Sequence, residues 1–286
     1  MQEVKIGVIG GSGIYDVEGI TDIRKEKIRT PFGDPSDKIV IGNLEGIPVA
    51  FLPRHGRGHS IMPSELNSRA NIYALKSLGV EQIISISACG SLKEELKPRD
   101  IVIPDQLFDR TRQRPYTFFG EGIVAHIGFA NPYCSELSRI LYQVAKDLGL
   151  SAHLGGTYVC IEGPQFSTKA ESKVFRSLGF SIIGMTNLPE AKLAREAEIC
   201  YATLGLVTDY DVWKEGEEVS VDKVIANMLA NIENVKKLVK AAIPRLERER
   251  KCECASALAY AIQTRKWAIN RRTARKLDLL IGKYLK

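Results

Sequence analysis

Short runs of Val and Ile alternate with longer amphipathic stretches along this chain, and this alternation constrains the fold more than any other feature. Apolar runs bounded by Gly, Pro or Asp predict β-strands, at residues 4–9, 38–41, 49–52, 82–87, 100–103, 156–161, 181–185 and 201–208. Apolar residues at helical spacing predict helices, at residues 64–77, 135–148, 168–178, 190–200 and 220–242. Near-continuous apolar strands separated by helices predict an α/β fold with a central, mostly parallel or mixed sheet flanked by helices.

Composition narrows the class of protein. Of 286 residues, 44% are hydrophobic and 26% are charged, which is enough apolar content for a packed core and unlike a disordered chain. No run of about 18 apolar residues occurs, so we expect no membrane span. The N-terminus has no long apolar segment of a signal peptide, so a cytoplasmic location is the expectation.

The excess of positive charge lies in the C-terminal tail. Residues 246–286 carry a formal charge of +7, whereas residues 1–245 sum to −1. We therefore expect a domain at residues 1–245 and a basic, helical C-terminal extension at residues 246–286. Apolar residues at helical spacing favour a tail packed on the body or on a neighbouring subunit. Nucleic-acid binding by the tail is the alternative, which no aromatic-rich strand or zinc-like spacing supports.

Four segments that follow predicted strands contain candidate chemistry. In the first, glycines at 10, 11 and 13 expose backbone N–H groups to an anion, and Ser12 adds a hydroxyl donor. Asp16 stands where a dinucleotide-binding fingerprint needs Gly or Ala, which argues against an NAD site. A tight turn that binds nothing is the alternative for this segment.

The second segment, Pro53–His59, contains two arginines and two of the four histidines of the chain. A guanidinium such as that of Arg54 matches phosphate oxygens bidentately, and His55 adds a further hydrogen bond. His55 and His59 lack the helical frame and acidic partner of a zinc-binding motif. We therefore favour an oxyanion site and expect no metal here.

The third and fourth segments combine small residues, hydroxyls and acids. Ser87 and Ala88 lie in a small-residue loop whose backbone N–H groups can approach a ligand closely, and Cys89 beside them is expected to be buried and inert. Met185 and Thr186 follow another strand. If the strand continues through Asp209 and Asp211, their side chains point to the same side and could bind a base or a metal. The alternative is that they cap the next helix.

Taken in order, these segments resemble the methylthioadenosine-cleaving members of the trimeric purine nucleoside phosphorylase family. The resemblance rests on GGSGIYD, LPRHGRGHSIMPSE, SACGSL, CIEGPQFSTKAES, GMTNLPEAKLAREAEICYA and TDYDVWKE, and covers the chain from about Lys5 to about Pro244. It implies phosphate-dependent cleavage of 5′-methylthioadenosine to adenine and 5-methylthioribose 1-phosphate, with orthophosphate as co-substrate and with no metal or organic cofactor. A purine nucleoside phosphorylase of broader specificity is the alternative, acting on adenosine, inosine or guanosine.

The resemblance also implies roles for individual residues. It places phosphate at Ser12, Arg54, His55, Ser87, Ala88 and Thr186. It places the ribose against Met185 and the base beside Phe166, Asp209 and Asp211, of which the two acids are the catalytic candidates. His126, contributed by a neighbouring subunit, and the apolar pair Val221 and Val224 would form the 5′ pocket, which implies a homotrimer or a hexamer built of trimers.

The cysteines are too few for a disulfide scaffold, and none has the C-x-x-C spacing of a zinc site. Heat-adapted relatives in the resembled family contain disulfides, and by that resemblance Cys134 with Cys200 and Cys252 with Cys254 are the suspected pairs. Free thiols are the alternative.

Overall fold

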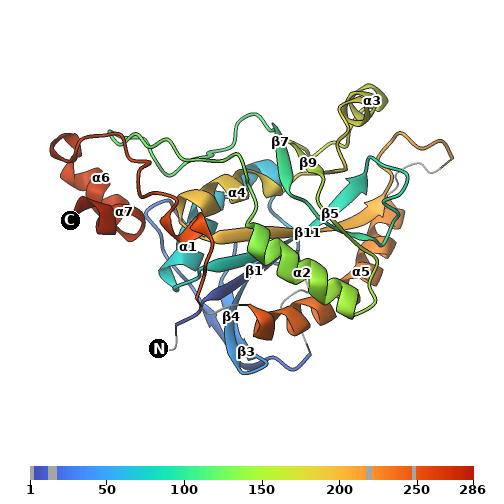
Figure 1. Cartoon of the computed structure of the whole chain (residues 1–286), viewed down its shortest axis with the longest axis horizontal. Helices are drawn as coiled ribbons and strands as arrows, with labels where there is room; N and C mark the ends of the chain where they lie inside the picture. The colour runs from blue at the N-terminus through green and yellow to red at the C-terminus, as the bar shows by residue number, and fades with distance from the viewer. Residues whose placement is uncertain (1–2, 12–17, 217–220, 247–248) are drawn as a thin grey trace.

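The structure, a computed structural model of the whole chain, describes residues 3–11, 18–216, 221–246 and 249–286. These residues form one sheet of 11 strands with helices on both faces (Figure 1). The strands are β1 (Ile6–Gly10), β2 (Thr21–Glu26), β3 (Ile39–Leu44), β4 (Ile47–Pro53), β5 (Gln82–Ser91), β6 (Ile101–Ile103), β7 (Gln106–Arg110), β8 (Ala152–Leu154), β9 (Thr157–Ile161), β10 (Ile182–Gly184) and β11 (Cys200–Asp209). The helices are α1 (Ser68–Ser77), α2 (Ser135–Asp147), α3 (Lys169–Ser177), α4 (Asn187–Glu196), α5 (Val221–Ala242), α6 (Arg271–Lys276) and α7 (Asp278–Leu285). The predicted α/β class is confirmed.

Buried strands and amphipathic helices lie where the apolar pattern places them. Each predicted strand and each of the five predicted helices overlaps an observed element, although residues 64–67 form a short 3₁₀ turn and a cap rather than the start of α1. The structure adds β2, β7 and β8. Strand β2, with the sequence TDIRKE, pairs with β3 at the edge of the sheet and is exposed along nearly all its length, so it has no apolar run to reveal it.

Strand β5 determines where the sheet opens. Its residues Gln82–Ser85 pair with β1 on one side, and the pairing ends there. On the same side, Gly90 and Ser91 pair with β10 instead, while β11 continues along the other side. The stretch between Ser85 and Gly90 therefore has a strand on one side only, and its backbone groups face open space near the carboxyl end of β1. This is where ligands bind in open α/β sheets.

Two apolar clusters hold the helices on the two faces of the sheet. One contains residues of α1 and α4, including Leu75 and Leu193. The other contains residues of α2 and α5, including Leu141 and Leu238. Burial of these side chains is the main force that holds the layers together.

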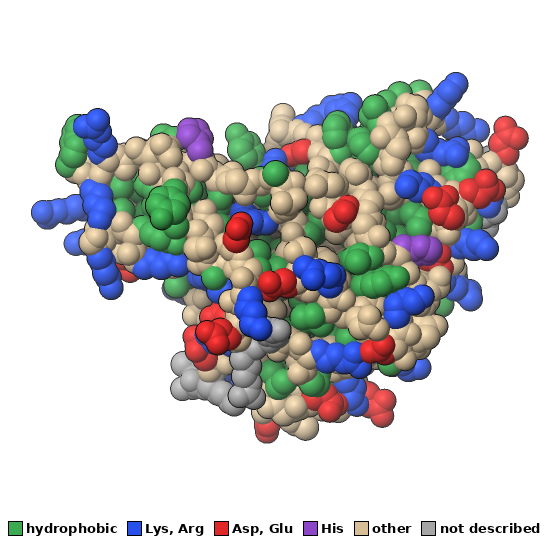
Figure 2. Space-filling view, in the orientation of Figure 1, with side chains coloured by type: hydrophobic (Ala, Val, Ile, Leu, Met, Phe, Trp, Pro, Cys, Tyr) green, Lys and Arg blue, Asp and Glu red, His purple; other side chains and the backbone are tan. Residues whose placement is uncertain are grey.

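The C-terminal tail packs on the body through buried apolar and charged contacts. Leu258 and Leu280 belong to the same buried cluster as α1 and α4, and the backbone N–H of Leu258 donates to Glu198 Oε1 at 3.1 Å. The extension, which we expected to be helical, has no α-helix at residues 254–263: a 3₁₀ turn at Glu253–Ser256 is followed by turns. Helices α6 and α7 form one end of the molecule (Figure 1), where Lys and Arg side chains gather (Figure 2). None of the helices in the described residues has the length and apolarity needed to cross a lipid bilayer.

Candidate active site

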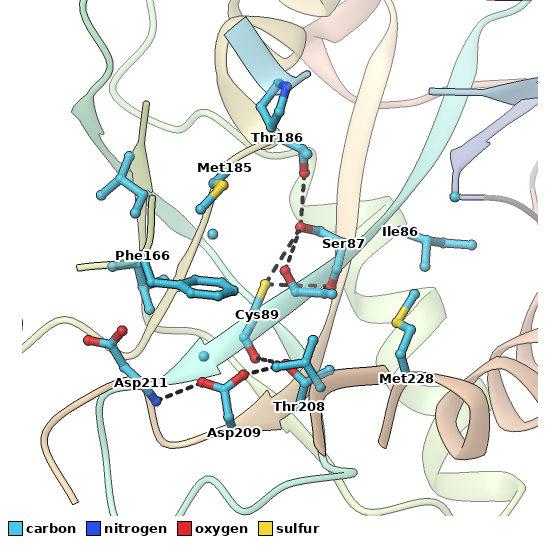
Figure 3. A pocket seen from close by; sticks show the side chains of 18 of the residues that line it. Ile86, Ser87, Cys89, Phe166, Met185, Thr186, Thr208, Asp209, Asp211 and Met228 are labelled. Carbon is cyan, nitrogen blue, oxygen red and sulfur yellow. Dashed lines mark hydrogen bonds between the residues drawn. The ribbon is translucent and has the colours of Figure 1, made fainter. Parts of the chain in front are cut away.

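A cavity of about 290 Å³ lies beside the part of β5 that pairs with neither β1 nor β10. Most of the predicted site residues line it: Arg54, His55, Ser87, Ala88, Phe166, Met185, Thr186, Asp209, Asp211 and Val224. Figure 3 shows the acids at one end and the hydroxyls of Ser87 and Thr186 at the other, with Phe166 and Met185 between them. Ser12 and the side chain of Val221 lie outside the described residues. His126 is not among the residues that line the cavity.

Arg54 is buried and bound by the protein more tightly than the sequence suggested. Its Nε and Nη2 donate to the Glu190 carboxylate at 2.5 and 3.1 Å. Nη1 donates to the carbonyl of Ile86 at 2.7 Å, and Nη2 also donates to Ser85 Oγ at 2.7 Å. These bonds occupy four of the five N–H donors of the guanidinium. The expected bidentate grip on phosphate is therefore wrong, because Glu190 already takes that face and one N–H is left for an anion.

His55 presents a neutral ring to the cavity. Its Nδ1 lies 2.8 Å from the carbonyl of Ile61 and so carries the proton. Burial and the Arg54 charge lower the pKa of His55 to about 4. The ring of His59 stacks on it with the centroids 4.4 Å apart. At neutral pH the Nε2 atom of His55 is therefore an acceptor, suited to a protonated oxygen of an oxyanion.

A chain of hydroxyls joins β5 and β9 to Thr186, the residue that precedes α4. Ser87 Oγ lies 3.0 Å from the Tyr158 hydroxyl and 2.9 Å from Thr186 Oγ1. Gly184 permits this arrangement, because a Cβ at that position would lie 2.0 Å from the Tyr158 hydroxyl. Such a chain can donate or accept protons as a ligand requires.

The acids stand at the end of β11, where a register shift between Val207 and Asp209 turns the strand. Asp209 Oδ2 accepts from Thr208 Oγ1 at 2.6 Å, and its Oδ1 accepts from the backbone N–H of Asp211 at 2.8 Å. Gly90 makes room for this carboxylate, since a Cβ there would lie 2.8 Å from Asp209 Oδ1. Burial raises the pKa of Asp209 and of Asp211. Both carboxyl groups are therefore easier to protonate than an ordinary aspartate.

Asp211 has unused hydrogen-bonding capacity that points to a ligand. Its φ of 50° lies in the left-handed region, a conformation often kept for function. Its Oδ2 atom is buried with no hydrogen-bond partner. The hydroxyls of Ser167 and Ser172 are also buried and unpaired, although both lie near enough to Asp211 to lower its pKa. Unpaired buried polar groups are costly, so a polar ligand is the natural partner.

Sequence reasoning missed several residues that form or support the cavity, among them Ser167 and Arg114. Ser167 lines it and follows the predicted Phe166, and only its burial without a partner distinguishes it. Arg114 lies behind the cavity, where its Nη1 donates to the carbonyls of Met185 and Leu188 at 2.7 and 2.6 Å. No local sequence pattern predicts the role of Arg114, because its hydrogen-bond partners are more than 40 residues away along the chain.

Comparison with known proteins identifies the family. A family model described as the phosphorylase superfamily matches residues 5–244. The chain belongs to the phosphorylase superfamily. The S-methyl-5′-thioadenosine phosphorylase of Geobacter sulfurreducens is 57% identical to this superfamily member over 100% of both chains. That of Koribacter versatilis is 56% identical over 99% of this chain and 97% of its own length.

Solved structures also resemble this superfamily member. The methylthioadenosine phosphorylase from an antarctic soil metagenomic library superposes with a TM-score of 0.94 at 50% identity, covering 98% of this chain and 99% of its own. The methylthioadenosine phosphorylase from Schistosoma mansoni in complex with adenine has a TM-score of 0.84 at 36% identity, covering 91% of this chain and 99% of its own. The full-length match to the Geobacter sulfurreducens protein shows that the tail beyond residue 244 has a counterpart in that relative.

Proposed function

We propose that this superfamily member cleaves 5′-methylthioadenosine with orthophosphate to give adenine and 5-methylthioribose 1-phosphate. The observation that carries the proposal is the polarity of the cavity. The buried Asp211, which has an unpaired oxygen, and the half-buried Asp209 face it from one end, while hydroxyls and a neutral histidine face it from the other. The names of the relatives support the same reaction. Salvage of a purine and of methylthioribose fits a cytoplasmic enzyme.

The acid end suits an adenine leaving group. The 6-amino group donates N–H, which the unpaired Oδ2 of Asp211 can accept. Cleavage of the N-glycosidic bond places negative charge on the base, and a protonated Asp209 can neutralise it by donating to N7. Burial raises the pKa of Asp209, which favours its protonated form relative to an ordinary aspartate. A 6-oxopurine presents an acceptor to the same oxygen, so inosine and guanosine are disfavoured.

The opposite end suits phosphate as the nucleophile. We assign phosphate to the hydroxyls of Ser87 and Thr186, the backbone at Ala88, the Nε2 atom of His55 and the remaining N–H of Arg54. Ser12 is assigned to the same site, although it lies outside the described residues. Phosphate held there attacks the anomeric carbon and offsets the positive charge that develops on the ribose.

The third part of the substrate site requires a neighbouring subunit. Phe166 is 50% exposed at the mouth of the cavity, and Met185 lies next to it against the proposed ribose. Val224 provides an apolar wall, to which Val221 would contribute. His126 is held away from its own cavity by a bond from its backbone N–H to the carbonyl of Ala261 at 2.8 Å, so we propose that it reaches the cavity of a neighbour in a homotrimer or a hexamer.

The test is purine release from methylthioadenosine, adenosine, inosine and guanosine, each with and without phosphate. We expect release that depends strictly on phosphate and favours methylthioadenosine. Equal or faster turnover of inosine would overturn the assignments of Asp209 and Asp211, and would favour the broader purine nucleoside phosphorylase. Release without phosphate would identify a hydrolase and overturn the phosphate site.

A further inference from the structure

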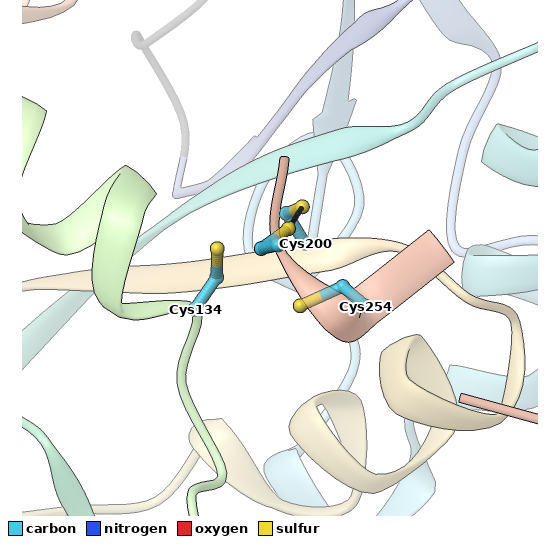
Figure 4. A group of neighbouring side chains, drawn as sticks. Cys134, Cys200 and Cys254 are labelled. Carbon is cyan, nitrogen blue, oxygen red and sulfur yellow. Dashed lines mark hydrogen bonds between the residues drawn. The ribbon is translucent and has the colours of Figure 1, made fainter. Parts of the chain in front are cut away.

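Four cysteines from three separate parts of the chain meet at the start of β11, and none of them lines the cavity. Cys134 stands immediately before α2, Cys200 begins β11, and Cys252 and Cys254 belong to the tail (Figure 4). Their four sulfur atoms all lie within 4.8 Å of one another. Both suspected disulfide pairs fall inside this cluster, yet all four cysteines are free thiols in the structure, as are Cys89 and Cys160.

The spacing of the sulfur atoms matches a tetrahedral metal site. Zinc–sulfur bonds of about 2.3 Å in a tetrahedron place the sulfur atoms about 3.8 Å apart. The sulfur atoms of Cys200 and Cys252 lie 3.2 Å apart, and none of the six pairs is separated by more than 4.8 Å. Small rotations of the side chains would therefore bring four thiolates around one ion.

The surroundings of the cluster suit a closed, structural site. The side chains of Cys134, Cys200 and Cys254 are at most 5% exposed, and Cys252 is half-buried. A cavity of about 290 Å³ reaches Cys134, Cys200 and Cys252, so an ion has a path to the cluster. A zinc ion with four thiolates carries a charge of about −2, and positive groups lie close to it. Nη1 of Arg250 is 4.0 Å from the sulfur of Cys200, and the N-terminus of α2, a helix of 13 residues, begins at Cys134.

We propose that Cys134, Cys200, Cys252 and Cys254 bind one zinc ion, which fastens the C-terminal tail to the body. Four thiolates leave no open position for water or substrate, so the ion is structural. Binding displaces the thiol protons, so it tightens as pH rises. The sequence conceals the site because only Cys252 and Cys254 are close together along the chain, and their spacing is not that of a zinc motif.

The anchored tail in turn holds the loop that carries His126. Beyond Cys254, the carbonyl of Ala261 accepts from the N–H of His126 at 2.8 Å, and the N–H of Gln263 donates to the carbonyl of Val124 at 2.9 Å. A metal that fixes the start of the tail therefore helps to fix this loop. Loss of the ion should free the tail before the sheet unfolds.

The experiment uses the full chain, lysed and purified without oxygen, then reduced, stripped of metal and titrated with Zn²⁺ or Co²⁺. We expect about one metal ion per chain, and for Co²⁺ the visible bands and sulfur charge-transfer absorption of a tetrahedral thiolate site. Cys254→Ser should weaken zinc binding by about 100-fold, because about a quarter of a typical structural zinc binding energy is lost. Cys160→Ser, a buried cysteine outside the cluster, should keep full stoichiometry.

Two results would overturn the proposal. One is a fully reduced chain, with all six thiols titratable, that binds no Co²⁺ or Zn²⁺ in competition with a weak chelating dye. The other is a disulfide among the four cysteines in protein kept without oxygen from lysis onward. Because the Co²⁺ spectrum is recorded on the unmodified chain, the proposal remains testable even if a cysteine variant fails to fold.

Discussion

Arg114 offers the sharpest test of how the cavity is held in shape. Its Nε donates to Glu162 Oε1 at 3.1 Å. Its Nη1 donates to the carbonyls of Met185 and Leu188 at 2.7 and 2.6 Å, and its Nη2 donates to those of Ile161 and Glu162 at 3.3 and 2.6 Å. All five N–H donors are thus used. One side chain joins the end of β9 to the segment that follows β10 and carries Met185.

Replacement of Arg114 by Met keeps much of the apolar volume and removes every one of these bonds. Four carbonyl groups and the Glu162 carboxylate lose their donor. Each buried group left unpaired costs about 1 to 3 kcal/mol, but Glu162 is partly exposed and water can replace some of the bonds. We therefore expect the free energy of unfolding to fall by about 3 to 5 kcal/mol. Movement of the Met185 segment should also lower kcat/KM by about 100-fold.

The assay combines urea unfolding with phosphate-dependent adenine release, and Arg110→Met is the matched control. Arg110 is exposed at the end of β7, so its replacement should change stability by less than about 0.5 kcal/mol. A loss of stability in Arg114→Met without a change in kcat/KM would show that the segment keeps its position unaided. An unchanged stability would refute the account of the five bonds.

Three further changes test other parts of the site and fold. Asp209→Asn should lower kcat for methylthioadenosine by about 100-fold or more while folding normally, because the proton donor to the base is lost; an unimpaired rate would remove Asp209 from the mechanism. Gly90→Ala places a Cβ 2.8 Å from Asp209 Oδ1, and we expect kcat/KM to fall by about tenfold, measured beside Gly128→Ala, where a Cβ meets nothing within 4 Å. Burial raises the pKa of Glu196 to about 7, so the folded state holds this proton more tightly than the unfolded state. Stability gained below about pH 4.5 is then lost as pH rises through 7, by about 3 kcal/mol, and urea unfolding between pH 5 and 8 should show a slope that Glu196→Gln removes.

The sequence was sufficient to predict the positions of the buried strands, but it was insufficient to predict the exposed or very short ones. Strand β11 is buried along nearly its whole length, and its apolar run gave its position to within a residue. The backbone of strand β2 pairs with β3, while nearly all of its side chains face solvent. No hydrophobic periodicity therefore marks this strand in the sequence. Strand β8 has three residues, too few for any pattern. Residues 254–263 of the tail have apolar residues at helical spacing, but the segment folds into turns, and its apolar side chains pack against the body.

The residues that form the cavity could be found from local motifs, but their partners could not. Ser87, Thr186 and Asp209 each follow a strand, and the topology brings strand ends together. Glu190, however, lies 136 residues from Arg54 along the chain. The ion pair between them forms only because α4 packs against the sheet. The same holds for Cys134, which meets Cys254 only because the tail returns to the start of β11. Long-range pairing of charges and sulfur atoms is a property of the packed fold.

The pairing of Arg54 with Glu190 changes how phosphate must be held. Arg54 is the one Lys or Arg among the described residues that line the cavity, and Glu190 cancels its charge. His55 is neutral because its pKa is lowered to about 4. Phosphate in our assignment is therefore bound by hydrogen bonds with hydroxyls, the backbone, His55 and one N–H of Arg54 rather than by net positive charge. Its negative charge is then not neutralised by the protein, and it remains available to stabilise the cationic ribose of the transition state.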